Sequence, residues 1–586
     1  MSSLLSEWIT PDADNRKAKN IADKLSLPLP IAQVLVGRGI DNASDADAFL
    51  TPRLSSLPDP FILPDMAAAV DRIWKAIDRN ERIVVHGDYD ADGVTATALM
   101  TLVLRSLGGN IETFIPNRMT DGYGFTTKTL AQCITDYSPS LIITVDCGTA
   151  AIDWPSDPLA DDLDVIITDH HEPSGKPAKA LAIVNPKVGG DHSAAQLAGV
   201  GVAFKLCHAI VKQGMANNRP EVSNIDLRNM LDLVAVGTIA DVVSLRNENR
   251  VLVKHGMYRL DSSQRPGFKA LREIAKVPNT PITARQISFL IAPRINAVGR
   301  MGHADSALEL LLTSNIDRAF ELAAVLDSAN IERRRTEDII CEEALSQVDL
   351  LPTDKRSGIV VGGDGWHIGT IGIVASRICE TYFCPAVVVA FDNSGVGRGS
   401  CRSIENINML DMLGACSELL VEFGGHKMAA GLTIRREKYE EFQAKFNAVC
   451  SLAFPSQYRR KPITIDAWLS RLGDADEILF DAIEKLRPFG AENESPVFAV
   501  KNVKVIGCPR LVGANRQHLK LSVGSGGTMM DAIAFDMGNR NLPPVELDIA
   551  FHLERNTYMG RANLQLNVVD FRASSPLHDS SIKSSE

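Results

Sequence analysis

Four short apolar runs in the first half of the chain each lead directly into acidic or histidine residues. Runs of Val and Ile without a polar face predict buried parallel strands, and the carboxyl ends of such strands meet at the edge where doubly wound sheets bind ligands. The runs and the residues that follow them are Ile83–Val85 before His86, Asp88, Asp90 and Asp92; Leu141–Val145 before Asp146; Val165–Thr168 before Asp169, His170 and His171; and Leu233–Ala240 before Asp241. We therefore expect these polar side chains to converge at one point.

Such a cluster predicts a divalent metal site. Carboxylates that are crowded together cannot all stay ionised unless a cation neutralises them. Oxygen ligands joined by the imidazole of His170 favour Mg²⁺ or Mn²⁺ over structural zinc, and two such ions would activate a water for in-line displacement at phosphorus. Helix capping explains any single Asp at a strand-to-helix turn, but it does not explain four such turns together.

The pattern along the rest of the chain predicts two α/β lobes joined by a long helix. From Arg82 onwards strands alternate with helices such as Val94–Leu107, which indicates a parallel sheet with crossover helices. Residues 315–346 have the spacing of one long amphipathic helix. A second α/β unit follows, with glycine-rich loops at residues 395–400 and 424–426. We expect a cleft between the two lobes.

A third kind of pattern begins after Lys461, where short apolar or alternating segments are separated by Gly and Asn. It predicts short strands in a small OB-like β-barrel, so the fold class is α/β with a C-terminal barrel. A chain of 586 residues is too long for one core. The expected divisions are an N-terminal lead-in (1–75), a catalytic lobe (76–250), a helical connector (251–350), a substrate-binding lobe (351–455), the barrel (456–573) and a disordered tail (574–586).

Composition indicates the compartment and excludes some classes of protein. Hydrophobic residues make up 45% and charged residues 23% of the chain, as in ordinary globular proteins. No apolar stretch reaches 18 residues and no basic region followed by an apolar one opens the chain, so we expect a cytoplasmic protein without a membrane partner. The ten cysteines include no Cys-x-x-Cys pair, which argues against a zinc ribbon or a disulfide framework. Nothing in the sequence demands an oligomer, and we expect a monomer.

The net charge of −11 would, taken alone, count against a nucleic-acid-binding protein. Net charge averages over all faces, however, and the metal-site carboxylates and the acidic stretch 153–164 supply many of the negative charges. Several arginines fall in the middle of the chain. A local basic groove is therefore compatible with the acidic total.

Two motifs carry a family resemblance: residues 88–93 (DYDADG) and the triplet 169–171 (DHH), each of which follows a predicted strand. Together they resemble the DHH phosphoesterase superfamily. Segments of the second α/β unit are similar to the lobe that accompanies the DHH lobe in that superfamily: residues 365–369, 371–377, 399–403 and 423–431. The segment 294–300 (RINAVGR) and the predicted barrel make the chain most similar to the RecJ family of exonucleases.

The resemblance implies a set of site residues. The implied metal ligands are Asp90, Asp92, Asp146, His170 and Asp241, with His86 or Asp88 as further candidates. The implied catalytic groups are His171, close to the scissile phosphate, Asp146 and Asp241. The candidate nucleic-acid contacts are Arg118, Arg294, Asn296, Arg300, Ser400, Arg402, Gly424, Gly425 and His426. Asp232 directly precedes the fourth apolar run and competes with Asp241, which follows it, as the metal ligand there; nine helical residues would place the two on opposite faces. We prefer Asp241 because it ends the apolar run.

The resemblance also implies an activity. The expected reaction is hydrolysis of single-stranded DNA from its 5′ end to 5′-mononucleotides, with two Mn²⁺ or Mg²⁺ ions, in DNA recombination and repair. Single-strand-binding protein and a RecQ-type helicase are the implied protein partners. Two alternatives stay open at this point: a DHH phosphodiesterase for short oligonucleotides or cyclic dinucleotides, and a non-catalytic single-strand-binding scaffold.

Overall fold

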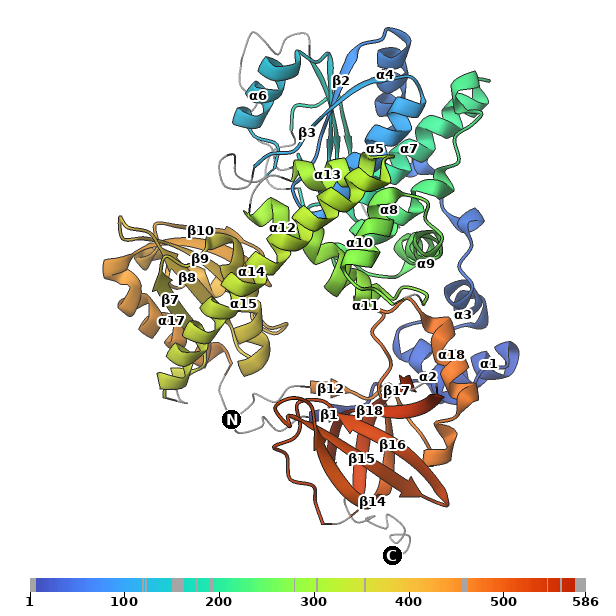
Figure 1. Cartoon of the computed structure of the whole chain (residues 1–586), viewed down its shortest axis with the longest axis vertical. Helices are drawn as coiled ribbons and strands as arrows, with labels where there is room; N and C mark the ends of the chain where they lie inside the picture. The colour runs from blue at the N-terminus through green and yellow to red at the C-terminus, as the bar shows by residue number, and fades with distance from the viewer. Residues whose placement is uncertain are drawn as a thin grey trace, which may run out of the picture. The chain divides into compact units, whose positions relative to one another are not determined.

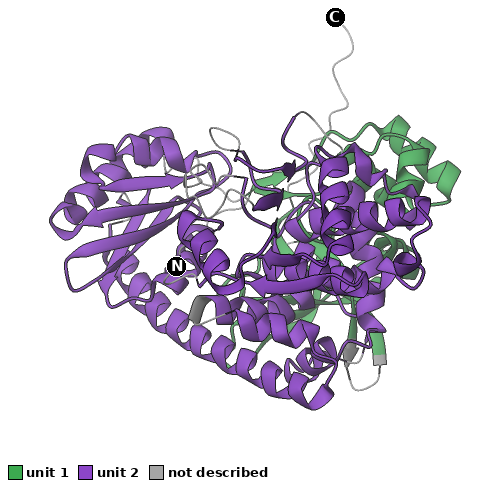
Figure 2. Cartoon of the chain, turned by 90° about the horizontal axis from the view of Figure 1, so that it is seen from above, with its two compact units in different colours: residues 1–53, 460–586 green, residues 54–459 purple. Residues whose placement is uncertain are grey.

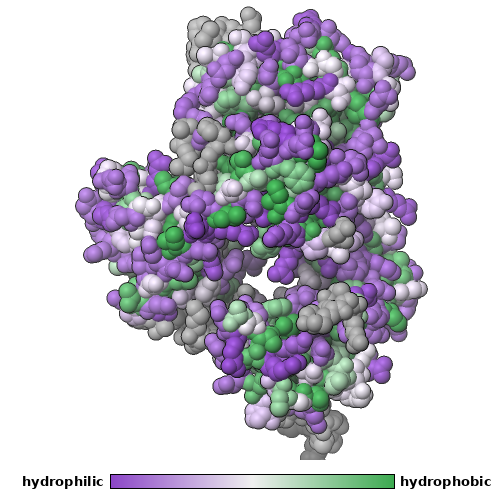
Figure 3. All heavy atoms as spheres, viewed as in Figure 1, coloured by the Kyte–Doolittle hydropathy of each residue, from purple (hydrophilic) through white to green (hydrophobic). Residues whose placement is uncertain are grey.

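The computed structural model describes residues 7–117, 121, 124–149, 163–173, 178–189, 194–278, 280–301, 304–352, 355–454, 462–544, 546–558 and 561–574. The chain divides into two compact units, one of residues 54–459 and one of residues 1–53 with 460–586 (Figure 2). Among the described residues, no helix combines the length and the apolar character needed to cross a membrane. The face seen in Figure 3 carries mainly hydrophilic residues between small apolar groups.

The first lobe of the larger unit contains the parallel sheet that the sequence predicted (Figure 1). The structure shows five strands in the order β3-β2-β4-β5-β6. Its strands are β2 (Arg82–His86), β3 (Asn110–Phe114), β4 (Leu141–Val145), β5 (Asp164–Thr168) and β6 (Ala182–Val184). Its helices are α4 (Met66–Asp78), α5 (Ala91–Ser106), α6 (Thr127–Tyr137) and α7 (Gly199–Ala216). All five residues of β4 are buried, which explains its uninterrupted apolar run.

The fourth apolar run is a helix, α8 (Leu231–Ala240), so the expectation of a strand was wrong there. This helix packs against α5, α7 and α9, and nearly all of its residues are buried. A helix that is apolar on every side lacks the periodicity that would distinguish it from a buried strand. Asp241 is the residue at which α8 ends.

Helices continue the larger unit as far as residue 350. They are α9 (Asn247–Asp261), α10 (Pro266–Ile274), α11 (Ala284–Gln286), a π-helical turn η6 (Ile287–Ile291), α12 (Ala292–Met301), α13 (Asp305–Leu312) and α14 (Ile316–Leu350). The predicted long helix is confirmed as α14, which begins after Asn315. The Asn315 side chain accepts hydrogen bonds from the backbone N–H groups of Asp317 and Arg318 and so caps the helix.

The second lobe of this unit has a mixed sheet in the order β10-β11-β9-β8-β7. Its elements are β7 (Ile359–Asp364), α15 (Ile368–Tyr382), β8 (Ala386–Phe391), β9 (Val396–Arg402), α16 (Met409–Gly414), β10 (Glu422–Gly425), β11 (Ala429–Arg435) and α17 (Tyr439–Ala453). The glycine-rich segments predicted as loops lie largely in strands β9 and β10. A Cβ at Gly399 would lie 2.7 Å from the Leu432 side chain, so glycine there permits close strand packing.

The smaller unit contains a closed five-stranded barrel. Its strands are β14 (Phe498–Val512), β15 (His518–Ser525), β16 (Thr528–Ala534), β17 (Leu547–Tyr558) and β18 (Arg561–Ala573), and β14 pairs with both β15 and β17. β14, β17 and β18 are long rather than short. Bulges between Val500 and Val503 and between Ile506 and Arg510 bend β14, so that one strand can contribute to two sides of a barrel.

The N-terminal residues complete this smaller unit. Strand β1 (Glu7–Ile9) pairs with β12 (Pro462–Thr464), and β13 (Ala467–Trp468) pairs with β14. The helices are α1 (Asn15–Leu25), α2 (Leu29–Gly37), α3 (Ala43–Leu50) and α18 (Glu477–Leu486). Ile31 and Leu35 share one apolar core with Leu486 and Phe498. Among the described residues of both units, short 3-10 turns lie at Leu54–Ser56, Pro60–Ile62, Pro220–Val222, Leu227–Met230, Ser417–Leu419, Arg436–Lys438 and Leu472–Asp474.

Candidate metal centre

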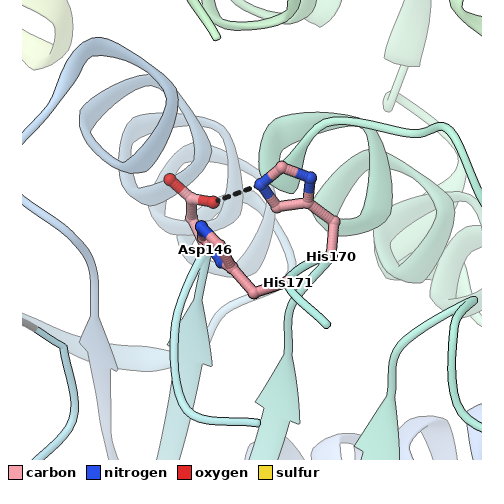
Figure 4. Close-up of side chains that lie close together, drawn as sticks. All are labelled: Asp146, His170 and His171. Carbon is pink, nitrogen blue, oxygen red and sulfur yellow. Dashed lines mark ion pairs between the residues drawn. The ribbon is translucent and has the colours of Figure 1, made fainter. Parts of the chain in front are cut away.

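Acidic and histidine side chains meet at the carboxyl edge of the parallel sheet, where β2, β4 and β5 end. The side chains form three groups, and within each group the ligand atoms lie within 4.8 Å of one another. The groups are Asp88, Asp90 and Asp146; Asp92, His170 and Asp241; and Asp146, His170 and His171. Figure 4 shows Asp146 and His170 facing each other across neighbouring strand ends. Asp146 and His170 each belong to two groups, so the cluster is continuous.

Three atoms of the cluster are buried without a hydrogen-bond partner among the described residues: Asp146 Oδ1, His170 Nε2 and Asp241 Oδ2. His170 Nε2 lies 3.1 Å from Asp146 Oδ1 and 3.5 Å from Asp241 Oδ2, but neither contact is a hydrogen bond. Buried polar atoms are costly unless something satisfies them. Bound cations would satisfy these atoms, so the donor set fits divalent metal.

The pKa shifts within the cluster also favour a bound divalent metal. Burial, followed by repulsion from neighbouring carboxylates, raises the pKa of Asp92 and of Asp146 well above the usual range. Burial and Asp90 raise the pKa of Asp241 to about 7. Burial lowers the pKa of His170 to about 3, which keeps the imidazole neutral and able to donate a lone pair. A dication would favour the ionised form of each carboxylate.

Local backbone structure fixes the carboxylates. The Asp90 side chain caps α5 by accepting the N–H groups of Asp92 and Gly93, at 2.9 and 3.1 Å. Asp92 in turn accepts the first N–H groups of α7, from Gly199 at 2.7 Å and from the next residue at 2.9 Å. Asp146 has a left-handed backbone with φ of 62°, a conformation that Asp adopts more readily than most residues. The cluster is therefore held by helix starts and one tight turn.

Asp169, the first residue of the DHH triplet, was expected to converge with the other polar residues but was assigned no role as a ligand or catalytic group. Its carboxylate accepts the N–H groups of Thr149, His170 and His171, and it lies 2.7 Å from His171 Nδ1. Burial lowers the pKa of His171, but the hydrogen bond and the charge of Asp169 outweigh it, so the net pKa is raised. Asp169 thus orients His171 and favours its cationic form. The signal in the sequence was its place directly after a buried strand.

His86 lies apart from the grouped ligand atoms. It is the last residue of β2, and its ring packs against Phe114 and Phe125 with centroid distances of 5.1 and 5.0 Å. Its Nδ1 lies 3.7 Å from the Cys147 sulfur. Burial lowers the pKa of His86 to about 4. These apolar surroundings suit a neutral buried imidazole.

The structure distinguishes the two carboxylates that flank the fourth apolar run. Asp241 lies in the metal cluster. Asp232, in the first turn of α8, instead accepts hydrogen bonds from Ser263 Oγ at 2.9 Å and Arg265 Nε at 3.2 Å. Asp232 is therefore committed to an ion pair within the helical region.

The predicted nucleic-acid contacts in the first lobe have varied surroundings. Asn296 on α12 accepts the backbone N–H of Ala91 at 2.7 Å and so ties this helix to the loop that carries the metal carboxylates. Arg294 is mostly buried and pairs with Asp327 on α14. Arg118 and the Arg300 side chain lie outside the described residues. Contacts of these arginines with DNA remain predictions.

The predicted contacts in the second lobe lie on β9 and β10, or directly after β10, and β11 lies between these two strands. Ser400 on β9 is in register with Gly431 on β11, which is in register with Gly424 on the edge strand β10. Arg402 Nη1 lies 3.3 Å from Ser400 Oγ. Gly425, with φ of 145°, ends β10 directly before His426. The sheet thus brings these five predicted residues, Ser400, Arg402, Gly424, Gly425 and His426, close together across the neighbouring strands β9, β11 and β10.

Comparison with known proteins agrees with this architecture. The family models described as "DHH family, N-terminal domain", "DHHA1 domain" and "RecJ OB domain" match residues 82–238, 355–452 and 465–570. The single-stranded-DNA-specific exonuclease RecJ of Bacillus subtilis is 35% identical over 571 residues, which cover 96% of this chain and 70% of the relative. The Escherichia coli protein of that name is 34% identical over 92% of this chain and 95% of its own length.

Solved structures give the same result. The crystal structure of RecJ in complex with Mn²⁺ from Thermus thermophilus matches with a TM-score of 0.80 and 29% identity, over 98% of this chain and 81% of that chain. The Mg²⁺ complex of the same protein matches with a TM-score of 0.76 and 28% identity, over 98% and 80%. The resemblance predicted from the sequence motifs is confirmed, and the chain belongs to the RecJ family of the DHH superfamily.

Proposed function

We propose that this protein is a metal-dependent, single-strand-specific exodeoxyribonuclease that attacks DNA from the 5′ end and releases 5′-mononucleotides. The observation that carries the proposal is the cluster at the end of the parallel sheet, with buried, unsatisfied ligand atoms in a chain of the RecJ family. The catalysed reaction is phosphodiester hydrolysis, with Mn²⁺ or Mg²⁺ as the cofactor, as in the solved RecJ complexes.

The ligand groups suggest how two ions would be held. Asp88, Asp90 and Asp146 form one set, while Asp92, His170 and Asp241 form the other. When bound, the ions supply Lewis-acid stabilisation of the phosphate oxygens and activation of the attacking water. Asp146 lies between the sets, because its Oδ1 is 3.1 Å from His170 Nε2. Asp146 could therefore contribute a ligand atom to either set.

The other polar groups would position the substrate. His171 is 43% exposed, whereas its partner Asp169 is buried, so the imidazole can reach a phosphate while Asp169 holds its orientation. A cationic imidazole there would offset the growing charge on the scissile phosphate. In the second lobe, the Ser400 hydroxyl and the Arg402 guanidinium supply a hydroxyl and a bidentate donor for a terminal phosphate.

Glycine also shapes the second-lobe surface. A Cβ at Gly372 on α15 would lie 3.1 Å from Ser400 Oγ and 3.2 Å from Arg402 Nη2. The absence of a side chain at Gly372 therefore leaves these two groups room to contact a ligand. This arrangement supports recognition of a 5′ phosphate, which would give the enzyme its polarity.

Polarity and products are tested with a single-stranded oligonucleotide labelled at its 3′ end, incubated with the enzyme and Mn²⁺. We expect a descending ladder of labelled fragments and release of unlabelled 5′-mononucleotides, with no ladder from Asp146→Ala. A labelled mononucleotide released first would instead establish the opposite polarity. Cleavage restricted to very short oligonucleotides would favour the small-substrate phosphodiesterase, and binding without cleavage would favour the scaffold.

The expected protein partners follow from the proposed activity on single-stranded DNA rather than from the residues of the metal centre. An enzyme that needs a free 5′ single strand depends on proteins that expose and coat such strands. A RecQ-type helicase would expose them, and single-strand-binding protein would coat them. Co-purification from cells, with nuclease treatment to remove bridging DNA, tests this expectation. Cell fractionation tests the proposed cytoplasmic location.

A further inference from the structure

An exposed aromatic side chain lies in the helical segment that precedes α12, the helix that contacts the metal-site loop. Phe289 is 64% exposed and lies in the π-helical turn η6, directly before α12. Isolated exposed apolar residues are common on protein surfaces. This one lies in a π-turn, which is a rare conformation that occurs frequently at functional sites.

The backbone around Phe289 is fixed by two arginines. Arg294 Nη1 donates to the Leu290 carbonyl at 2.6 Å, and its Nη2 lies 2.8 Å from Asp327 on α14. Arg334, also on α14, donates a long hydrogen bond of 3.5 Å to the Phe289 carbonyl. A π-turn alters the regular helical hydrogen bonds, and these guanidinium groups engage two of its carbonyls. The Phe289 ring therefore projects from a turn whose backbone is stabilised by these two arginines.

The same helix contacts the metal loop. α12 packs beside α14 (Figure 1), and it follows η6 directly along the chain. Asn296 on α12 accepts the backbone N–H of Ala91, between the metal carboxylates Asp90 and Asp92. Seven residues separate Phe289 from Asn296, which corresponds to about 10 Å along a helix. Phe289 is thus near enough to contact a nucleotide of a strand bound at the metals.

The chemistry around the ring suits a single strand of nucleic acid. The Arg285 guanidinium lies 5.8 Å from the centre of the Phe289 ring, and Arg334 is exposed on the neighbouring helix. Exposed aromatic rings bordered by cations bind single strands by stacking on bases and attracting phosphates. A base within a duplex is covered on both faces by its neighbours, so it has no open face for Phe289.

We propose that Phe289, with Arg285 and Arg334, forms a stacking site that holds an unpaired base of the substrate strand while the metal centre cleaves it. This inference rests on the proposed function. The site contributes affinity and strand selectivity, and the chemical step belongs to the metal cluster. Phe289 is therefore a positioning residue.

Binding is measured with a single-stranded oligonucleotide that carries 2-aminopurine at one of its first positions from the 5′ end, in EDTA to prevent cleavage. Stacking on Phe289 should quench the fluorophore. Phe289→Ala should lose the quenching and raise the Kd and the KM roughly tenfold or more, while kcat at saturating DNA and the melting temperature stay unchanged. Phe289→Trp should restore binding. Tyr258→Ala, which removes a 74% exposed aromatic on α9, is the matched control.

The arginines give an independent readout. Arg334→Gln or Arg285→Gln should each lower the slope of log Kd against log salt concentration by about one. Wild-type quenching, Kd and KM in Phe289→Ala would overturn the stacking site and leave the proposed function intact if the wild-type enzyme degrades DNA. A wild-type enzyme that neither binds nor degrades single strands would overturn both. Unchanged DNA affinity in Phe289→Ala with loss of a protein partner would assign the surface to protein binding and would also overturn the proposal.

Discussion

Gly199, the first residue of α7, has no room for a side chain beside the metal centre. Its backbone N–H donates to Asp92 Oδ2 at 2.7 Å, and a Cβ built on it would lie 2.6 Å from both Cβ and Cγ of Asp146. Carbon atoms in contact are ordinarily about 3.5–4.0 Å apart. Gly199→Ala therefore forces Asp146 and the start of α7 apart by about 1 Å.

The size of the effect follows from this displacement. Metal sites tolerate ligand displacements of about 0.2 Å, and a misplacement of about 1 Å in an active site costs on the order of 100-fold in rate. We expect Gly199→Ala to lower the exonuclease rate by about two orders of magnitude and to weaken Mn²⁺ binding at least tenfold. Overpacking at a buried position should cost about 1–3 kcal/mol of folding free energy.

The assay compares Gly199→Ala with Gly201→Ala, two residues further along the same helix. A Cβ at Gly201 would lie 3.1 Å from a terminal methyl of Leu197, which can move aside, so this variant should keep near wild-type activity. Degradation of single-stranded DNA, Mn²⁺ titration calorimetry and urea unfolding are measured on both. Wild-type rate and Mn²⁺ affinity in folded Gly199→Ala would refute the placement of Asp146 as a metal ligand.

Three further predictions concern the cluster and its surroundings. Asp232→Asn weakens the ion pair with Arg265, so it should lower the free energy of unfolding in urea by about 2 kcal/mol and leave most of the nuclease activity. Asp241→Asn should abolish nuclease activity without lowering the stability of the metal-free protein. The reverse pattern would exchange the roles of the two residues. The folded pKa of Asp241, about 7, lies above the usual 3.8, so metal-free stability falls as pH rises through this window. The Mn²⁺-induced rise in Tm should therefore be larger at pH 8 than at pH 6, and an equal or smaller rise would contradict this linkage. Val242 is 69% exposed and has a left-handed backbone with φ of 60°, which strains a β-branched residue. Val242→Gly should relieve this backbone strain and raise the free energy of unfolding by about 1 kcal/mol, and a lower urea midpoint would contradict the presence of the strain.

The parallel sheet and the metal cluster could be predicted from the sequence because buried strands leave a continuous apolar run that ends at a polar residue. The strands before Asp146 and His170 follow this pattern. The helix before Asp241 does not, because α8 is surrounded by other helices and lacks periodicity. The convergence was predicted correctly there although the element type was wrong.

Other features depend on tertiary contacts that leave no local pattern. Asp169 resembles a metal ligand in sequence, and only its hydrogen bonds identify it as the partner of His171. Arg294 resembles a surface cation, yet Asp327, 33 residues away, holds it. The glycines of β9 indicated loops because the sequence does not show which side chains press against them. These are non-local pairings, which single-sequence patterns do not encode.

The proposed function requires the cluster at the sheet edge to bind two divalent ions. Anomalous X-ray scattering from crystals grown with Mn²⁺ is the most direct measurement of such binding. We expect two strong peaks, one beside Asp88, Asp90 and Asp146 and one beside Asp92, His170 and Asp241, with the peaks lost or weakened in Asp146→Ala. Crystals with saturating Mn²⁺ and an active enzyme but no anomalous peak at these residues would contradict it.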